Sequence, residues 1–152
     1  MPHEVKSRDI KDSVSNMLWG RAAGRCEFDG CNRLLSRSPV TQEDVNIAER
    51  AHIWSFSDGG PRGNEGIDDD SLNDVGNLML ACHDCHRKMD KEKDGGRYPV
   101  ELLQTWKSAH EHRVELVTGI NPSKRSHVWM YGANVGDQAA PIDFNLARTA
   151  LF

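Results

Sequence analysis

The sequence predicts a small α+β protein in which helices flank a pair of short strands and one structural zinc site. Three observations lead to this prediction. Apolar residues recur at helical spacing in two long segments. Two shorter apolar runs between these segments are typical of strands, and four cysteines occur as two close pairs. With 152 residues, the chain is expected to form one compact domain with extensions.

The first predicted helix covers residues 7–24. Ser7 is a suitable N-cap, and Gly24 is a suitable stop signal. The apolar positions that repeat along this segment are Ile10, Val14, Met17, Leu18 and Ala22. A tight turn is then expected at residues 26–31, because the Asp29-Gly30 pair is a strong turn signal.

The middle of the chain predicts two strands and a short helix. Residues 45–54 are apolar enough for a strand and contain His52. The glycine-rich segment that follows, through the acidic residues 68–70, is expected to be one long loop that is functional or mobile. Residues 77–81 form a short apolar run leading into Cys82, and a helix over residues 83–91 fits what comes next.

The clearest predicted helix covers residues 99–118, with proline at its first position and Gly119 as its stop. Its predicted apolar stripe consists of Leu102, Leu103, Trp106, Ala109, Val114 and Val117. His110 and His112 lie two positions apart and therefore face different directions. Both histidines are predicted to lie on the surface.

The net charge of −4 argues weakly against a nucleic-acid partner, but the charge is unevenly distributed. Residues 41–74 hold nine acidic and two basic residues, a net of −7, so the rest of the chain carries +3. Basic residues gather beside the cysteine pairs, at Arg21, Arg25, Arg33 and Arg37 and again at Arg87, Lys88, Lys91, Lys93 and Arg97. Such clusters can bind phosphates; an ordinary mixed surface is the alternative.

The spacing of the cysteines indicates a metal site. Four residues separate Cys26 from Cys31, and two separate Cys82 from Cys85, so each short turn can direct two thiolates at one ion. Four thiolates complete a tetrahedral zinc site, which leaves no open position for a substrate. Buried free thiols and disulfides are the alternatives. Disulfides are disfavoured, because a chain without an apolar leader or a membrane-spanning run is expected to be cytoplasmic.

Three further segments resemble the HNH endonuclease family, whose core is the ββα-metal fold. They are Ala51-His52-Ile53, Asn77-Leu78-Met79-Leu80 and the run from Cys82 to His86. The resemblance implies hydrolysis of DNA phosphodiester bonds with Mg²⁺ or Mn²⁺. It makes His52 the general base and His86 a ligand of the divalent ion, while Asn77 would orient the His52 ring or join the metal shell.

The expected site departs from the family at one position. Many members place a metal-binding acid directly before the strand histidine, where this chain has Ala51. Asp90, four residues after His86 on a helix, is therefore the predicted second ligand, or a residue of the acidic loop compensates. Glu49 is not chosen, because three positions along a strand it faces away from His52. The predicted phosphate contacts are Arg50, Arg87 and Lys88.

The chain also resembles HNH–SAVED effectors of CBASS antiphage systems, through residues 18–26, the AHIW segment and HVWMYGANVG. The resemblance implies a nuclease domain at residues 1–121, then a linker and the start of a SAVED sensor at residues 122–152. The implied partners are double-stranded DNA, a cyclic oligonucleotide bound by the missing sensor, and further copies of the parent chain. No membrane partner is implied. A non-catalytic zinc-stabilised nucleic-acid-binding module is the main alternative. A zinc-held interaction domain, using the acidic residues 58–74 for a basic partner, is another.

Overall fold

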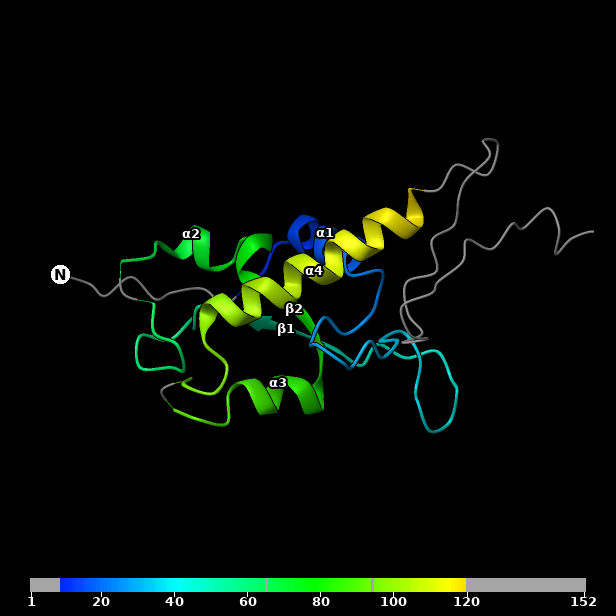
Figure 1. The fold of residues 1–152 in the computed structure, drawn as a ribbon, viewed down its shortest axis with the longest axis horizontal. Coiled ribbons are helices and arrows are strands. Elements are labelled where there is room, and N and C mark those ends of the chain that lie inside the picture. The colour runs from blue at the N-terminus through cyan, green and yellow to red at the C-terminus, as the bar shows by residue number, and fades with distance from the viewer. Residues whose placement is uncertain (1–8, 65, 94, 120–152) are drawn as a thin grey trace, which may run out of the picture. The chain divides into compact units, whose positions relative to one another are not determined.

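The computed structural model describes residues 9–64, 66–93 and 95–119 (Figure 1). Ser7 and the predicted linker and sensor segment at residues 122–152 lie outside the described residues. The chain divides into two compact units, Met1–Glu115 and Leu116–Phe152. The first unit contains all the strands and helices described here except the last turn of the final helix, and its elements follow one another in the order α1 (Asp12–Arg21), β1 (Ala48–His52), α2 (Asp69–Leu72), η1 (Val75–Asn77), β2 (Leu78–Cys82), α3 (His83–Met89) and α4 (Val100–Thr118).

The predicted α+β composition is confirmed, with two strands and both flanking helices present. β1 and β2 pair antiparallel, with Ala51 opposite Met79 and His52 opposite Leu78. All five residues of β2 are buried, because α1 and α3 both contact this strand. Figure 1 shows α3 on one side of the strands and α1 and α4 on the other. Because β2 is covered on both sides, its residues are apolar at every position and not only at alternate positions.

Helix α1 is shorter than predicted. It begins after Lys11, which makes no side-chain capping hydrogen bond, and its C-cap is Ala22. Gly24 has φ +63° and its N–H bonds to the carbonyl of Trp19, so the predicted glycine stop is present. Leu18 and Ala22 are completely buried and anchor α1 in the core.

Helix α4 begins at Val100, one residue after the predicted start. The predicted stripe is only partly correct, because Leu103 is buried whereas Ala109 and Val117 are exposed. Lys107 is buried in their place: its ammonium lies 3.8 Å from the Glu27 carboxylate and 2.5 Å from Glu111. Burial raises the pKa of Glu27 to about 7. The helix therefore docks through charged groups that a purely apolar pattern cannot reveal.

The predicted surface position of His110 is wrong, since this residue is only 4% exposed. Its Nε2 donates to the carbonyl oxygen of Ala22 at 3.0 Å, and Arg113 donates to its Nδ1 at 2.9 Å. A carbonyl only accepts and a guanidinium only donates, so these contacts select the neutral ring. Burial, together with the charge of Arg113, lowers the pKa of His110. His112 is exposed, as predicted.

The neutral state of His110 predicts a pH dependence of stability. A histidine whose pKa is lowered by folding stabilises the protein fully above its unfolded pKa of about 6.5, and this contribution is lost as the pH falls. We expect His110→Gln to reduce the loss of unfolding free energy between pH 7 and pH 5, measured by urea denaturation. His112→Gln serves as the control and is expected to follow the wild type. Equal pH profiles for all three proteins would contradict the assignment.

Candidate metal and catalytic site

The four cysteines come together beside the start of α3. One Sγ atom from each of Cys26, Cys31, Cys82 and Cys85 lies within 4.8 Å of all the others, and none forms a disulfide. The Sγ atoms of Cys31 and Cys82 are 3.9 Å apart. A tetrahedron with Zn–S distances of about 2.3 Å has S–S edges of about 3.8 Å. The cluster could therefore hold a metal ion such as zinc, as the spacing predicted.

Backbone hydrogen bonds fix the first cysteine pair against the second. The N–H of Glu27 bonds to the carbonyl of Leu80, and the N–H of Leu80 bonds to the Glu27 carboxylate at 2.6 Å. The N–H of Cys82 donates to the Cys26 sulfur at 3.3 Å. Gly30, at φ +75°, closes the turn between Cys26 and Cys31. The thiols thus join a turn, the end of β2 and the first turn of α3.

The protonation of the thiols depends on the ion. Burial raises the pKa of Cys26 to about 12 and raises the pKa of Cys85 as well. Without a cation these thiols are neutral near pH 7, and a bound zinc ion must displace their protons. The cation then compensates the charge of three buried thiolates and one half-buried thiolate, so an occupied site contributes to folding.

Metal removal is expected to unfold this protein. Cys85→Ser, or a strong chelator, should abolish zinc binding and destabilise the fold by up to the order of 10 kcal/mol. Zinc per chain measured by mass spectrometry should fall from one ion to none, and the helical circular dichroism signal should fall with it. Adding zinc back should restore the signal for the chelated wild type but not for the variant. A cooperative thermal transition that persists unchanged without metal would contradict the prediction.

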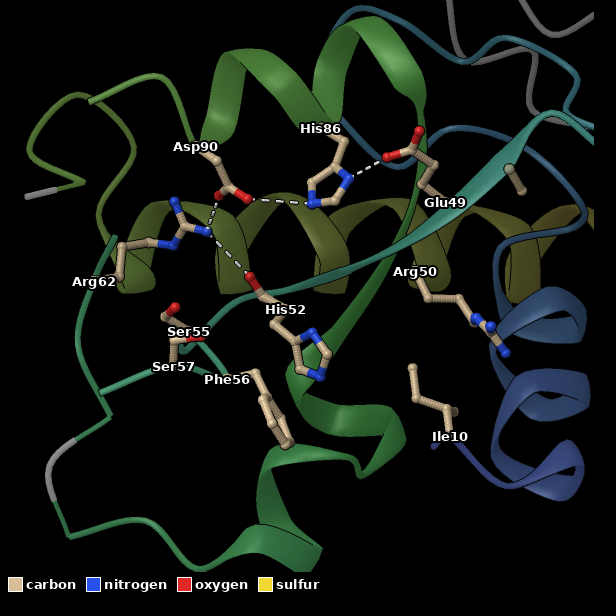
Figure 2. Close-up of a pocket in the computed structure, with 11 residues that line it drawn as sticks. Ile10, Glu49, Arg50, His52, Ser55, Phe56, Ser57, Arg62, His86 and Asp90 are labelled. Carbon is tan, nitrogen blue, oxygen red and sulfur yellow. Dashed lines mark hydrogen bonds and ion pairs between the residues drawn. The ribbon is translucent and has the colours of Figure 1, made fainter. Parts of the chain in front are cut away.

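A second group of polar residues lines a cavity of about 490 Å³ around the end of β1 (Figure 2). His52, His86 and Asp90, three of the four residues predicted for the catalytic centre, line this cavity, as does Arg50. Arg50 is exposed and its guanidinium lies 3.5 Å from the Ser15 hydroxyl. Arg87 lies in an adjoining hollow with His86 and Asp90, whereas Lys88 lines neither of these two hollows.

His86 lies between two carboxylates. Its Nδ1 contacts Glu49, and its Nε2 is 3.2 Å from Oδ2 of Asp90. The hydrogen bond with Asp90 is the largest cause of a raised pKa at His86, and Glu49 acts in the same direction. Burial opposes ionisation of Asp90, but hydrogen bonds from His86 and Arg62 lower its pKa overall. These two contacts fix the orientation of the His86 ring.

Glu49, which was not chosen as a metal ligand, lines the cavity and contacts His86. Figure 2 shows its side chain reaching toward α3 while the His52 ring points to the other side of β1, as strand alternation requires. The cavity nevertheless extends around β1, and both side chains line it. Ala51 is fully buried opposite Met79, so it leaves no room for the acid that the family places there. Glu49 shares the face of Ala51 and also bonds to His83 Nδ1 at 2.5 Å.

Asn77 does not orient the His52 ring, which was one of its two predicted roles. Its Oδ1 accepts from the N–H of Trp54 at 2.7 Å, and its Nδ2 donates to the carbonyls of Trp54 and Leu72 at 3.1 and 2.9 Å. These hydrogen bonds fix the chain just after β1 and do not reach the His52 ring, whereas the predicted place of Asn77 in the metal shell stays a prediction. Asn73 orients that ring instead, with 3.1 Å between its Oδ1 and His52 Nε2, and the Phe56 ring lies 5.6 Å away.

Arg62, like Asn73, is a site residue that sequence reasoning missed. Its buried guanidinium donates to the carbonyls of Ile53, Met89 and His52 at 2.6, 2.8 and 3.1 Å. It also bonds to Oδ1 of Asp90 at 2.7 Å. One side chain thus joins the loop, the end of β1 and the end of α3. An arginine in a glycine-rich loop gives no sequence signal for such a position.

Comparisons with known proteins add no family to this picture. Neither the protein-family models nor the curated proteins that were searched contain a match to this chain. Among the described residues, the four cysteines are the only group of three or more potential ligands close enough to share one ion. Within the same residues, no helix combines the length and the apolar character needed to cross a bilayer.

The packing of Arg62 can be tested through Gly95. A Cβ atom added to Gly95 would lie 2.4 Å from Cγ and 2.9 Å from the backbone nitrogen of Arg62, and Gly95 has φ +68°. Gly95→Ala should therefore lower the unfolding free energy by about 1–3 kcal/mol, measured by urea denaturation. Gly59→Ala is the matched control, because its added Cβ meets nothing within 4 Å. Equal midpoints for the two variants would contradict the packing described.

Proposed function

We propose that this chain is a metal-dependent endonuclease of the HNH type, which hydrolyses phosphodiester bonds of double-stranded DNA. The observation that carries the proposal is the shared cavity. It is lined by an imidazole on one side of β1 and by an imidazole–carboxylate pair on the other, and Cys85, next to His86, belongs to the thiol cluster. A site that only binds DNA requires none of this arrangement.

His86 and Asp90 would hold the divalent ion. Their facing atoms, 3.2 Å apart, are close to the edge of an Mg²⁺ octahedron, about 2.9 Å for ligand distances of about 2.0–2.1 Å. Water and substrate oxygens would complete the shell, as is usual for this ion. Glu49 holds the opposite nitrogen of His86, and Arg62 holds the other oxygen of Asp90. Such outer contacts orient ligands and tune their basicity.

His52 would act as the general base. A neutral imidazole accepts a proton from the attacking water as the new phosphorus–oxygen bond forms and the bond to the leaving 3′ oxygen breaks. When bound, a divalent cation supplies stabilisation of the negative charge that develops on the phosphate and on the leaving oxygen. Asn73 orients the ring, while Asn77 fixes the chain that follows it. Arg50, which lines the same cavity, would pair with a phosphate of the bound strand.

The finer proposal is that this nuclease is part of a CBASS effector. It rests on the resemblance of residues 18–26 and of the HVWMYGANVG segment to HNH–SAVED proteins. In that arrangement a sensor domain after residue 121 binds a cyclic oligonucleotide, and assembly of several chains releases DNA degradation in the cytoplasm. DNA cutting by the parent chain would then depend on the cyclic oligonucleotide.

The non-catalytic DNA-binding module stays the second candidate, and one observation favours it. His86 contacts a carboxylate at each of its ring nitrogens. A closed network of this kind is a self-consistent structural ion pair even without a catalytic cation. The two candidates differ in whether a cation replaces the contact between His86 and Asp90.

Plasmid cutting separates these candidates. With Mg²⁺ or Mn²⁺ present, His52→Ala should cut supercoiled plasmid at least about 100-fold more slowly than the wild type, with zinc content unchanged. Asp90→Asn should raise the Mg²⁺ concentration needed for half-maximal cutting. His112→Ala, an exposed histidine on α4, is the matched control and should cut normally.

The assay is run on the 152-residue chain and on a chain extended through the proposed sensor domain, with and without cyclic oligonucleotides. Cutting that depends on the cyclic oligonucleotide would support the effector proposal. A wild type that binds DNA but never cuts it, in either form, would leave the binding module as the function. Equal cutting by the wild type and His52→Ala would remove His52 from the mechanism.

A further inference from the structure

A separate hollow beside α3 combines aromatic and basic side chains. Its volume is about 290 Å³, at the small end of the range for ligand pockets. None of the proposed catalytic residues lines it. Its lining consists of Phe28, Lys88, Lys91, Glu92, Arg97 and Tyr98.

The aromatic side of this hollow is held rigidly. The rings of Phe28 and Tyr98 meet edge to face with 5.4 Å between centroids, and Trp106 of α4 lies 4.9 Å from Phe28. Phe28 belongs to the turn between Cys26 and Cys31, and Tyr98 comes just before α4. Both rings are half-buried, so each is supported from behind while part of it stays accessible. Rings in this state offer a flat apolar surface at little cost in entropy.

The charge around these rings is positive. Three cations, Lys88, Lys91 and Arg97, face one acid, and all three are exposed. The Arg97 guanidinium carbon lies 5.7 Å from the centre of the Tyr98 ring. The single acid, Glu92, accepts a hydrogen bond from the backbone N–H of Arg97 at 3.1 Å and so fixes this turn. The hollow therefore suits a flat group attached to an anion.

The hollow connects to the proposed catalytic site. Lys91 also lines the adjoining hollow formed with Glu49, His86, Arg87 and Asp90. His86 and Asp90 in turn line the cavity that contains His52. The three hollows therefore neighbour one another along α3 between His52 and Tyr98, and Arg87, Lys91 and Lys88 line the two that lie nearer Tyr98. A nucleic-acid strand is the polyanion whose flat groups repeat along such a row.

We infer that the Phe28–Tyr98 hollow binds an unpaired nucleobase of the DNA strand that passes His86 and Asp90. The base lies against the two rings, and the adjacent phosphates pair with Lys88, Lys91 and Arg97. This inference rests on the proposed nuclease function and adds to it a preference for duplexes that carry a single-stranded tail, gap or flap. A base can lie against these rings only after it has left the stack of a duplex, so paired and stacked bases do not use this hollow.

DNA binding measured in Ca²⁺ tests the inference. Fluorescence anisotropy is compared for a blunt hairpin duplex and for the same duplex with a short 5′ or 3′ single-stranded tail. The wild type should bind one tailed duplex roughly 10-fold more tightly than the blunt duplex. Tyr98→Leu should abolish this preference while leaving blunt-duplex affinity unchanged, and Tyr98→Phe should retain it.

The basic side chains are tested by salt dependence. Arg97→Gln and Lys91→Gln should weaken binding of the tailed duplex and lower the slope of log affinity against log salt by about 1 each. Lys93→Gln is the matched control, because Lys93 is exposed and lines none of the three hollows. It should leave the preference for the tailed duplex intact. Zinc content and thermal stability are measured for every variant, and Arg97→Gln decides the result if Tyr98→Leu fails to fold.

The possible outcomes separate this inference from the proposed function. If the wild type cuts plasmid but binds blunt and tailed duplexes equally, the base site is overturned and the nuclease stands. Retention of the full preference by Tyr98→Leu, or by Arg97→Gln where Tyr98→Leu fails to fold, also overturns it. If the wild type neither binds nor cuts DNA, in both the 152-residue and the extended form, the proposed function fails and the inference falls with it.

Discussion

The cluster of four thiols is the constraint on which the rest of this structure depends. It joins two segments that are far apart in the sequence, the turn at residues 26–31 and the junction between β2 and α3. The sheet has only two strands, and a pair this small is marginally stable in water without further support. With the junction held, β2 can be buried on both sides and α3 can leave it at a fixed angle. The first turn of α3 then carries both Cys85 and His86, so scaffold and candidate site share one short helix.

Around this junction, the candidate site is built from hydrogen bonds rather than from apolar packing. Glu49 contacts His86 of α3, and Arg62 contacts Asp90 at the C-cap of this helix, so the pair is held from opposite ends. On the other side of β1, Asn73 orients the ring of His52 and Asn77 fixes the backbone that follows it. Each polar group is directed by a second polar group, an arrangement that keeps buried or half-buried charges at defined positions.

The sequence was most informative where residue types and short spacings act together. The cysteine spacing predicted the thiol cluster, and the apolar runs predicted both strands and all the longer helices. His52, His86 and Asp90 were predicted to lie in one site, and all three line the same cavity. The thiol cluster, the strands and the helices were predicted from local patterns of neighbouring residues. His52 and His86 were predicted through the resemblance to HNH proteins, and Asp90 through its helical spacing from His86.

Long-range contacts account for what the sequence did not reveal. Arg62 and Lys107 look like solvated charges in the sequence, yet tertiary contacts bury both. His110 was placed on the surface because nothing nearby in the sequence indicates the carbonyl of Ala22, its partner 88 residues away. Asn77 and Asn73 are four residues apart, and only the fold decides which of them reaches His52. Strand alternation correctly predicted that Glu49 and His52 point to opposite sides of β1, but it could not show that one cavity extends to both sides.

The burial of Arg62 also changes how the segment between β1 and α2 should be regarded. In the sequence this segment looks like one long loop. In the structure it forms two loops, because the Arg62 guanidinium donates hydrogen bonds to the carbonyls of Ile53 and Met89 and so fixes the middle of the segment. Asn64 contributes by donating to the carbonyl of Phe56 at 2.9 Å. Insertions or deletions between residues 57 and 61 would therefore misplace the arginine.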